Sequence, residues 1–264
     1  AARTGLVEGD DTAPGTPDDV HYDMDQYGLA ANEGFTSLNM RTSVITMPAN
    51  GRIPPLVPQA LERREARAAF RRGREFDGPE FRGLTERCVA YPATLPPILA
   101  FGYNSNLQIF QSPGQVLIQG EMGDPRIIPT DGRPALPPQV LHWMGESRGH
   151  WEGNALVVET TNLMPVPSMT NIGTTGSPPW NDTPVSENSR IVERFTMTGP
   201  DSIEYEMTFE DPTLYVEPWT AKLDWARDES YGKFEYACHE GQYMIRDYIN
   251  AYRAGEAASG AGEE

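Results

Sequence analysis

The chain has 264 residues, which at roughly 150 residues per domain corresponds to one large domain or slightly more. Its 38 acidic residues outnumber its 21 basic residues, and the formal net charge at pH 7 is −17. Because a nucleic-acid-binding protein needs a basic surface to neutralise phosphates, this charge makes nucleic acid and anionic lipid poor partners. No apolar run approaches the ~18 to 20 residues of a transmembrane helix, so we expect no membrane span.

The first 34 residues have the composition of an acidic extended arm. This stretch contains eight acidic residues, its only lysine or arginine is Arg3, and its apolar residues show no periodicity. Such a segment cannot bury enough apolar surface to fold alone. The chain starts with Ala rather than Met, and no signal-peptide pattern follows, which fits an exported chain after signal-peptide removal or an engineered start.

After the arm we expect a single β-rich domain over residues 35–254. It begins with a strand at 42–47, a turn at 48–51 and a helix at 58–72 with Pro in its first turn. Six arginines lie between residues 63 and 74. Because glutamates are interleaved with them, we interpret this stretch as a solvated helix face rather than an anion-binding patch.

Strand patterns then recur at the short spacing that is typical of antiparallel sheets. Residues 202–209 alternate strictly between apolar and polar side chains, as in a strand with one buried face. The predicted strands are 107–111, 115–122, 154–161, 190–198, 202–209, 219–225 and 234–238. Residues 244–252 change to helical spacing, and we expect a helix there that ends at Gly255 and packs on the sheet.

The predicted fold is therefore mainly β, with one helix on the amino side and one at the carboxyl end. A lipocalin-like antiparallel barrel is the first interpretation, because the hairpins follow one another in sequence, and a two-sheet sandwich is the second. Residues 164–188 form a long proline-rich loop, a kind of segment that is frequently functional or partner-facing. Residues 255–264 consist of Ala, Gly, Ser and Glu, and we expect them to form a flexible tail.

The chain lacks the common motifs of cofactor binding and catalysis. It has no G-x-G-x-x-G sequence, no P-loop and no G-x-S-x-G nucleophile elbow. Its four histidines show no short spacing of a metal pair, and its two cysteines show no metal-site pattern. We therefore expect no metal and no cofactor.

Five residues remain as candidates for ligand binding. His239 and Glu240 lie between the last predicted strand and the helix, where they can form an acid/base pair or cap the chain beside a disulfide. Asn104 belongs to a run of amide side chains that can line a barrel interior or simply form turns. Arg148 and Trp151 lie in the polar sequence SRGHWEG, which we interpret as a pocket or as a stacked turn.

Cys88 and Cys238 are the only cysteines. In an exported protein, two cysteines most simply form one disulfide. Two unrelated free thiols are the alternative.

Six motifs in order, RIIPTDGRP, WMGESRGHWEGNALVVETTN, IVERFT, YEMTFEDP, PWTA and YACHEGQY, resemble those of an uncharacterised family of exported bacterial proteins. The resemblance covers about residues 42–252. It implies a signal peptide and a cysteine pair corresponding to Cys88 and Cys238, and it implies no activity. The acidic arm, the longer loop at 164–188 and His142 depart from the family pattern, which indicates a specialised member.

These observations favour a non-catalytic interaction protein of the periplasm or the extracellular space. An accessory subunit of a membrane complex, such as a cytochrome or photosynthetic reaction-centre assembly, is one form of this function. We expect the protein partner to contact the arm at 1–34, the loop at 164–188 and the tail at 255–264.

The alternative function is an enzyme or carrier for a small polar molecule bound inside the barrel. Its polar centre would combine His239, Glu240, Arg148 and Asn104. The two functions differ in whether these side chains converge on a cavity or whether the rings of the core, Trp219 and Trp225 among them, fill the interior.

Overall fold

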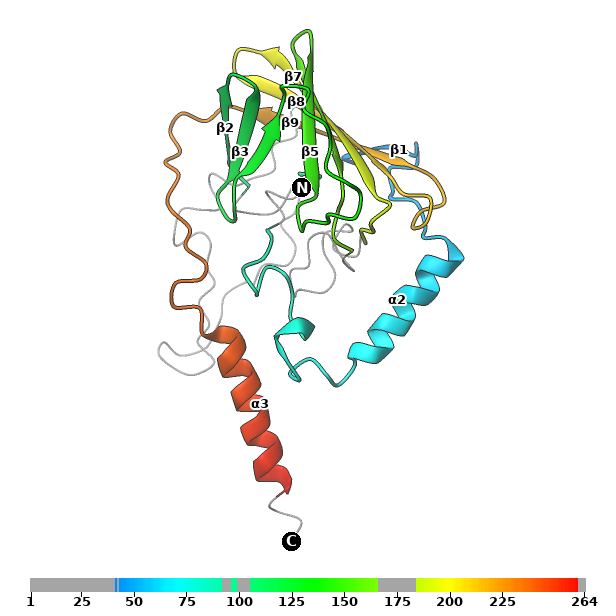
Figure 1. Ribbon diagram of the computed structural model, residues 1–264, viewed down its shortest axis with the longest axis vertical. Coiled ribbons are helices and arrows are strands. Elements are labelled where there is room, and N and C mark those ends of the chain that lie inside the picture. The colour runs from blue at the N-terminus through cyan, green and yellow to red at the C-terminus, as the bar shows by residue number, and fades with distance from the viewer. Residues whose placement is uncertain (1–40, 42, 92–95, 99–104, 166–183, 261–264) are drawn as a thin grey trace. The chain divides into compact units, whose positions relative to one another are not determined.

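The computed structural model describes residue 41 and residues 43–91, 96–98, 105–165 and 184–260 (Figure 1). The chain divides into two units, Ala1–Thr36 and Ser37–Glu264, and every described residue belongs to the second. The predicted arm at 1–34, Asn104 and most of the loop at 164–188 therefore lie outside the described residues.

The larger sheet contains six antiparallel strands in the order β1-β9-β8-β7-β6-β5. Their bounds are β5 (Glu146–Glu152), β6 (Ala155–Thr161), β7 (Arg190–Gly199), β8 (Ser202–Glu210), β9 (Trp219–Ala226) and β1 (Ile45–Met47). Strands β5 to β9 lie beside their neighbours in sequence, whereas β1 comes from the start of the described chain and pairs with β9.

A smaller antiparallel sheet has the order β2-β3-β4 and contains β2 (Leu107–Ser112), β3 (Gln115–Gly120) and β4 (Arg126–Pro129). Strand β4 lies beside β5, but no hydrogen-bonded ladder joins them. The mainly β, antiparallel class predicted from the sequence is confirmed. The described strands form two sheets and no closed barrel.

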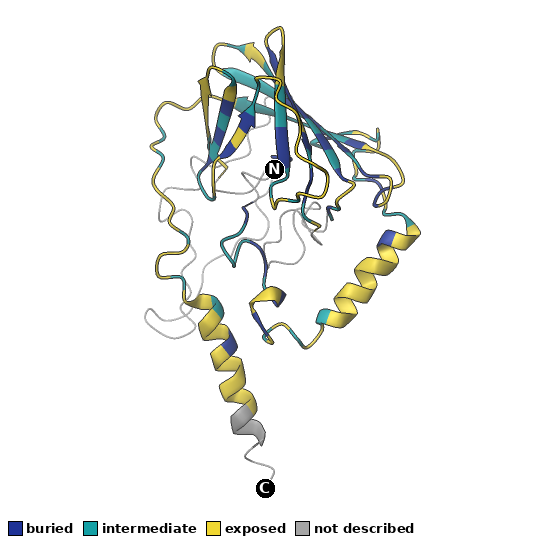
Figure 2. Ribbon diagram, in the orientation of Figure 1, coloured by how far each residue is buried: buried dark blue, intermediate teal, exposed yellow. Residues whose placement is uncertain are grey.

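The core lies against the faces of the strands that the alternating pattern predicts to be inward (Figure 2). Tyr205, Met207 and Phe209 of β8 are fully buried, and the intervening residues are half-buried. Phe209 stacks on Trp219 with ring centroids 5.5 Å apart, and Tyr205 stacks on Trp225 at 4.7 Å. Large aromatic rings therefore cover the inward face of these two strands.

Helix α2 (Pro58–Arg71) begins at the predicted residue and ends one residue before the predicted Arg72. The backbone N–H of Val57 donates to the Leu214 carbonyl oxygen at 2.8 Å, which holds the start of the helix against the loop after β8. Ala60 is the buried residue of α2, and almost all of its other residues are exposed (Figure 2).

Helix α3 (Met244–Gly260) continues past Gly255, where the sequence predicted its end. A single Gly costs a helix only about 1 kcal/mol relative to Ala, and the alanines around it favour the helix. The expectation that this helix packs on the sheet is also wrong. Tyr252 instead stacks on Phe76, with ring centroids 4.9 Å apart, and Arg253 donates a hydrogen bond to the Asp77 carbonyl oxygen.

The strand predicted at 234–238 is absent, and the described residues 227–237 contain no strand at all. Phe234 is 82% exposed, so the apolar side of this alternating pattern does not face the core. The pattern has a different physical cause: Tyr236 and Cys238 contact a second loop segment around the disulfide.

Candidate functional site

Arg148 and Trp151 both lie on β5 and not in a turn. Arg148 forms an ion pair with Glu146 and donates to the Pro134 carbonyl oxygen at 3.3 Å. Trp151 is opposite Leu156 of β6 and is 48% exposed. Residues three apart on a strand point to opposite faces of the sheet, so these two side chains do not form one pocket.

His239 and Glu240 lie in the turn that begins at Cys238, and both are exposed. The Glu240 N–H donates to the Ala237 carbonyl oxygen at 3.0 Å, which closes this turn. No described hydrogen bond or ion pair joins either side chain to Arg148 or Trp151. Among the residues that the structure describes, the predicted polar centre is therefore not assembled, and Asn104 lies outside them.

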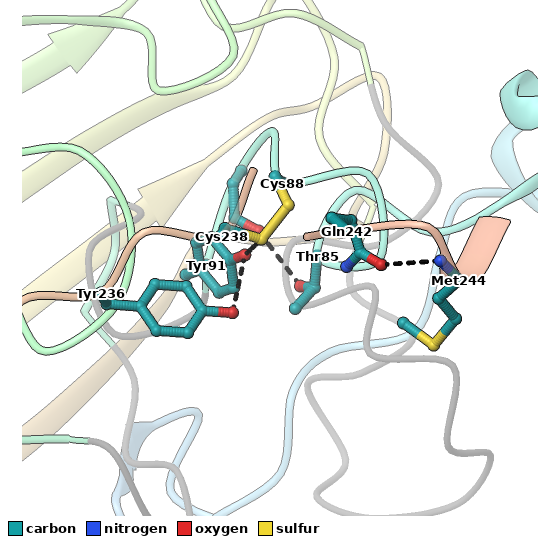
Figure 3. The surroundings of a disulfide bond; sticks show 8 residues. Thr85, Cys88, Tyr91, Tyr236, Cys238, Gln242 and Met244 are labelled. Carbon is teal, nitrogen blue, oxygen red and sulfur yellow. Dashed lines mark hydrogen bonds between the residues drawn. A yellow bond between two sulfur atoms is a disulfide. The ribbon is translucent and has the colours of Figure 1, made fainter. Parts of the chain in front are cut away.

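Cys88 and Cys238 form a disulfide with a Cα–Cα distance of 5.7 Å. Figure 3 shows Tyr91 beside this bond, where its hydroxyl contacts both the Cys238 Sγ and the Tyr236 hydroxyl. The two tyrosine rings meet edge to face with centroids 5.3 Å apart. Burial, and then the hydrogen bond with Tyr236, raises the pKa of Tyr91. The disulfide predicted from the sequence is therefore present, packed against a protonated tyrosine.

A buried polar network crosses the inward faces of five consecutive strands. Arg126 of β4 donates to the Ser147 hydroxyl of β5 at 2.9 Å, to the Thr160 hydroxyl of β6 at 2.8 Å and to Glu193 Oε1 of β7 at 3.0 Å. The Tyr205 hydroxyl of β8 donates to the same Glu193 oxygen at 2.8 Å. Each of the five side chains is nearly or fully buried, and the network joins the smaller sheet to the larger one.

Glu193 accepts from two groups, and the Tyr205 hydroxyl in turn accepts from the Ile98 N–H at 2.8 Å. Burial, and then the carboxylate of Glu193, raises the pKa of Tyr205 well above its usual value. Charges that are paired and hydrogen-bonded on all sides hold strands in place, and this arrangement leaves the carboxylate engaged rather than free to act as a base. We interpret the network as structural.

Sequence reasoning missed this network, although one signal for it was present. Glu193 alternates with Ile191 and Phe195 on the inward side of its strand. A carboxylate at such a position requires a buried cation, and Arg126 is the partner.

A concave surface with charged walls lies at the carboxyl end of α2. An open groove of about 310 Å³, which we call the α2 groove, is lined by Arg67, Phe70, Arg71, Glu80 and Phe81. Arg71 donates a hydrogen bond to the Phe81 carbonyl oxygen, and this bond holds the helix against the short 3₁₀ helix Pro79–Phe81. Burial, and then the positive charge of Arg67, lowers the pKa of Arg71.

The described residues contain no group of three or more His, Cys, Asp or Glu side chains that could hold a metal ion. None of the described helices is both long enough and apolar enough to cross a membrane.

Compared with known proteins, the chain matches no family model, no curated protein and no solved structure. The resemblance to exported bacterial proteins, which depends on the six motifs, therefore stays a prediction. The functional interpretation depends on the geometry of the chain itself.

Proposed function

We propose that this chain is a non-catalytic interaction protein of an oxidising compartment, which binds as an accessory subunit to a larger protein assembly. The observation that supports this proposal most is the state of α2. The helix is anchored at both ends, by Val57 to Leu214 and by Arg71 to Phe81, yet Ala60 is its buried residue. A helix that is held in place without contributing its faces to the core is suited to present those faces to a partner.

The disulfide supports the choice of compartment. Disulfides persist in the periplasm and outside the cell, whereas reductants in the cytosol keep thiols reduced. The Cys88–Cys238 bond therefore favours a periplasmic or secreted protein.

For the arrangement of the strands, we propose that the two sheets belong to one up-and-down meander. Every strand from β2 to β9 lies beside its neighbour in sequence, and β4 and β5 are in contact without a ladder. The network around Arg126 bridges this gap through side chains. This arrangement resembles an incompletely closed barrel more than two independent sheets.

The alternative function, an enzyme or carrier for a small polar molecule, has less support. It requires Asn104, Arg148, His239 and Glu240 around one interior cavity. His239 and Glu240 lie on an exposed turn, and the rings of Trp219 and Tyr205 occupy the interior.

Site-specific photo-crosslinking in the organism that makes the protein tests the proposed function. A photoreactive amino acid replaces Leu61 or Arg64, both exposed on α2, or the exposed Met197 of β7 as a control. We expect a discrete crosslinked adduct from both α2 positions and none from position 197. The proposal is wrong if neither α2 position yields an adduct, or if all three positions yield the same one.

A further inference from the structure

The spacing of the arginines on α2 destabilises this helix. Arg63, Arg67 and Arg71 follow one another at intervals of four residues, which places them on the same face. Like charges at this spacing destabilise a helix. Within the described chain, Glu62 and Glu65 form no ion pair that would offset this repulsion.

On the six-stranded sheet, by contrast, cationic side chains are paired with carboxylates. Arg190 pairs with Glu159, and Lys222 pairs with Glu206 at 2.7 Å, so these positive charges are neutralised on the surface. By contrast, Arg64, Arg67 and Arg72 have no carboxylate partner among the described residues. A chain with a net charge of −17 thus keeps a local excess of guanidinium groups along α2.

Aromatic rings lie at the carboxyl end of α2, beside the guanidinium groups of Arg71 and Arg74. Phe70 is 60% exposed, and its ring centroid is 6.0 Å from that of Phe81. The guanidinium carbon of Arg74 is 4.4 Å from the Phe70 centroid and 4.9 Å from the Phe81 centroid. Arg74 itself pairs with Asp77 at 2.8 Å, so the α2 groove combines an apolar surface with the positive charges of Arg67 and Arg71. Its lining also includes Glu80, so an incoming carboxylate gains most on the side of Arg67.

The net charge decides which anionic partner fits. A membrane or a nucleic acid presents an extended negative surface, which would also meet the acidic remainder of the chain. A polypeptide can place a few carboxylates at the groove within the Debye length of about 8–10 Å, without bringing a large anionic surface close. The local geometry and the overall charge together favour a protein segment.

We propose that the α2 groove binds an acidic segment of a partner protein. An aromatic or aliphatic side chain of this segment contacts Phe70 and Phe81, and aspartates or glutamates beside it pair with Arg67 and its neighbours. This inference rests on the proposed function, because it gives the chemistry of the partner that α2 binds. Arginine is suited to this recognition because its planar guanidinium group donates two parallel hydrogen bonds to a carboxylate.

Fluorescence anisotropy with the purified full chain tests the inference. The probe is a labelled synthetic peptide in which aspartates and glutamates flank one phenylalanine, and a second peptide carries serine in place of the phenylalanine. We expect the phenylalanine peptide to bind more tightly, and its affinity to fall as salt rises. Arg67→Glu should weaken its binding by about tenfold or more, because the change reverses a charge in the groove wall.

Arg52→Glu is the matched control. Arg52 is also exposed and has no carboxylate partner in the described part of the chain, and its replacement changes the net charge by the same amount. We expect this change to alter the affinity by no more than about twofold, because salt screens the effect of a charge that lies outside the groove. Phe70→Ser should remove the preference for the phenylalanine peptide. Circular dichroism of each variant checks that the fold is retained.

Three results would overturn the inference. They are the absence of peptide binding, an equal loss of affinity in Arg52→Glu and Arg67→Glu, and tighter binding of phosphatidylglycerol vesicles or single-stranded DNA than of the peptide at the same salt concentration. If crosslinks form at positions 61 and 64 while the peptide fails to bind, α2 remains a partner surface and only the acidic chemistry is wrong. If the peptide binds but no crosslink forms, the proposed function is wrong.

Discussion

Arg126 and Glu193 form an ion pair whose side chains are only 3% and 0% exposed. Removing one partner of a buried pair leaves an uncompensated charge, which costs about 3–5 kcal/mol. We therefore expect Glu193→Gln to lower the free energy of unfolding by this amount, measured by urea denaturation. The control is Glu159→Gln, which breaks an exposed pair with Arg190 on the same sheet and should cost less than about 1 kcal/mol. Equal effects of the two substitutions would contradict the structural role of the network.

The raised pKa of Tyr205 predicts that the folded state loses stability in alkaline solution. Its folded-state pKa is raised by burial and by Glu193, whereas an unfolded tyrosine ionises near pH 10. The stabilisation is therefore complete below pH 10 and is lost as the pH rises above it, because only the unfolded chain releases this proton. Tyr205→Phe should reduce the slope of unfolding free energy against pH above pH 10, in denaturation curves collected at several pH values. Tyr243→Phe, at an exposed position, is the control for the loss of a tyrosine hydroxyl.

The Cys88–Cys238 disulfide links the segment that follows β9 to the loop around Cys88. The bond spans 150 residues, and the chain-entropy model gives a closed loop of this size about 4–5 kcal/mol of stabilisation. In the double variant Cys88→Ser with Cys238→Ser, we expect a lower thermal midpoint and faster tryptic cleavage at Arg227 and Lys233. Thermal denaturation followed by circular dichroism measures the midpoint, and mass analysis of the tryptic fragments over time measures the cleavage. Quantitative thiol labelling of the native protein without reductant would show instead that the bond does not form.

The strands differ in how visible they are in the sequence. Strands β7 and β8 are predicted correctly because aliphatic and aromatic residues occupy most of their inward positions. Strand β5 is not visible in the sequence, where SRGHWEG indicates a pocket or a stacked turn, because its inward positions include Ser147 and Gly149. The Ser147 hydroxyl accepts a hydrogen bond from the buried Arg126. At position 149 there is no room for a side chain, because a Cβ there would lie 2.9 Å from the Ile128 Cγ2 atom. These residues are dictated by contacts with β4, so local periodicity cannot reveal the strand.

The candidate site was only partly visible for a similar reason. The sequence shows the arginines of α2, but interleaved glutamates favoured the interpretation as a solvated face. The groove also needs Phe81, which belongs to a separate 3₁₀ helix and reaches α2 through the fold. The charge pattern was therefore predictable, whereas the aromatic surface beside it was not.

The composition of the acidic arm predicts that its removal affects partner binding more than the stability of the fold. Residues 1–34 contain few large apolar side chains, so their removal should lose little apolar burial. We expect the thermal midpoint of the truncated chain to change by only about 2–4 °C, which for a chain of this size corresponds to about 1 kcal/mol. Binding to the partner should decrease, which the crosslinking yield from a photoreactive amino acid at position 64 measures. A truncated chain that fails to fold would show that the arm supplies part of the fold.

The pairing of β1 with β9 also affects how the chain reaches its native state. Ile45 of β1 pairs with Ala221, so a strand made early must wait for the last strand of the sheet. Pairings between residues so distant in sequence form slowly, while the hairpins between β5 and β9 can form as soon as they are made. Until β1 pairs with β9, the edge of β9 exposes free N–H and C=O groups that other chains can bind. The large negative charge counteracts such association, because two incompletely folded copies repel each other.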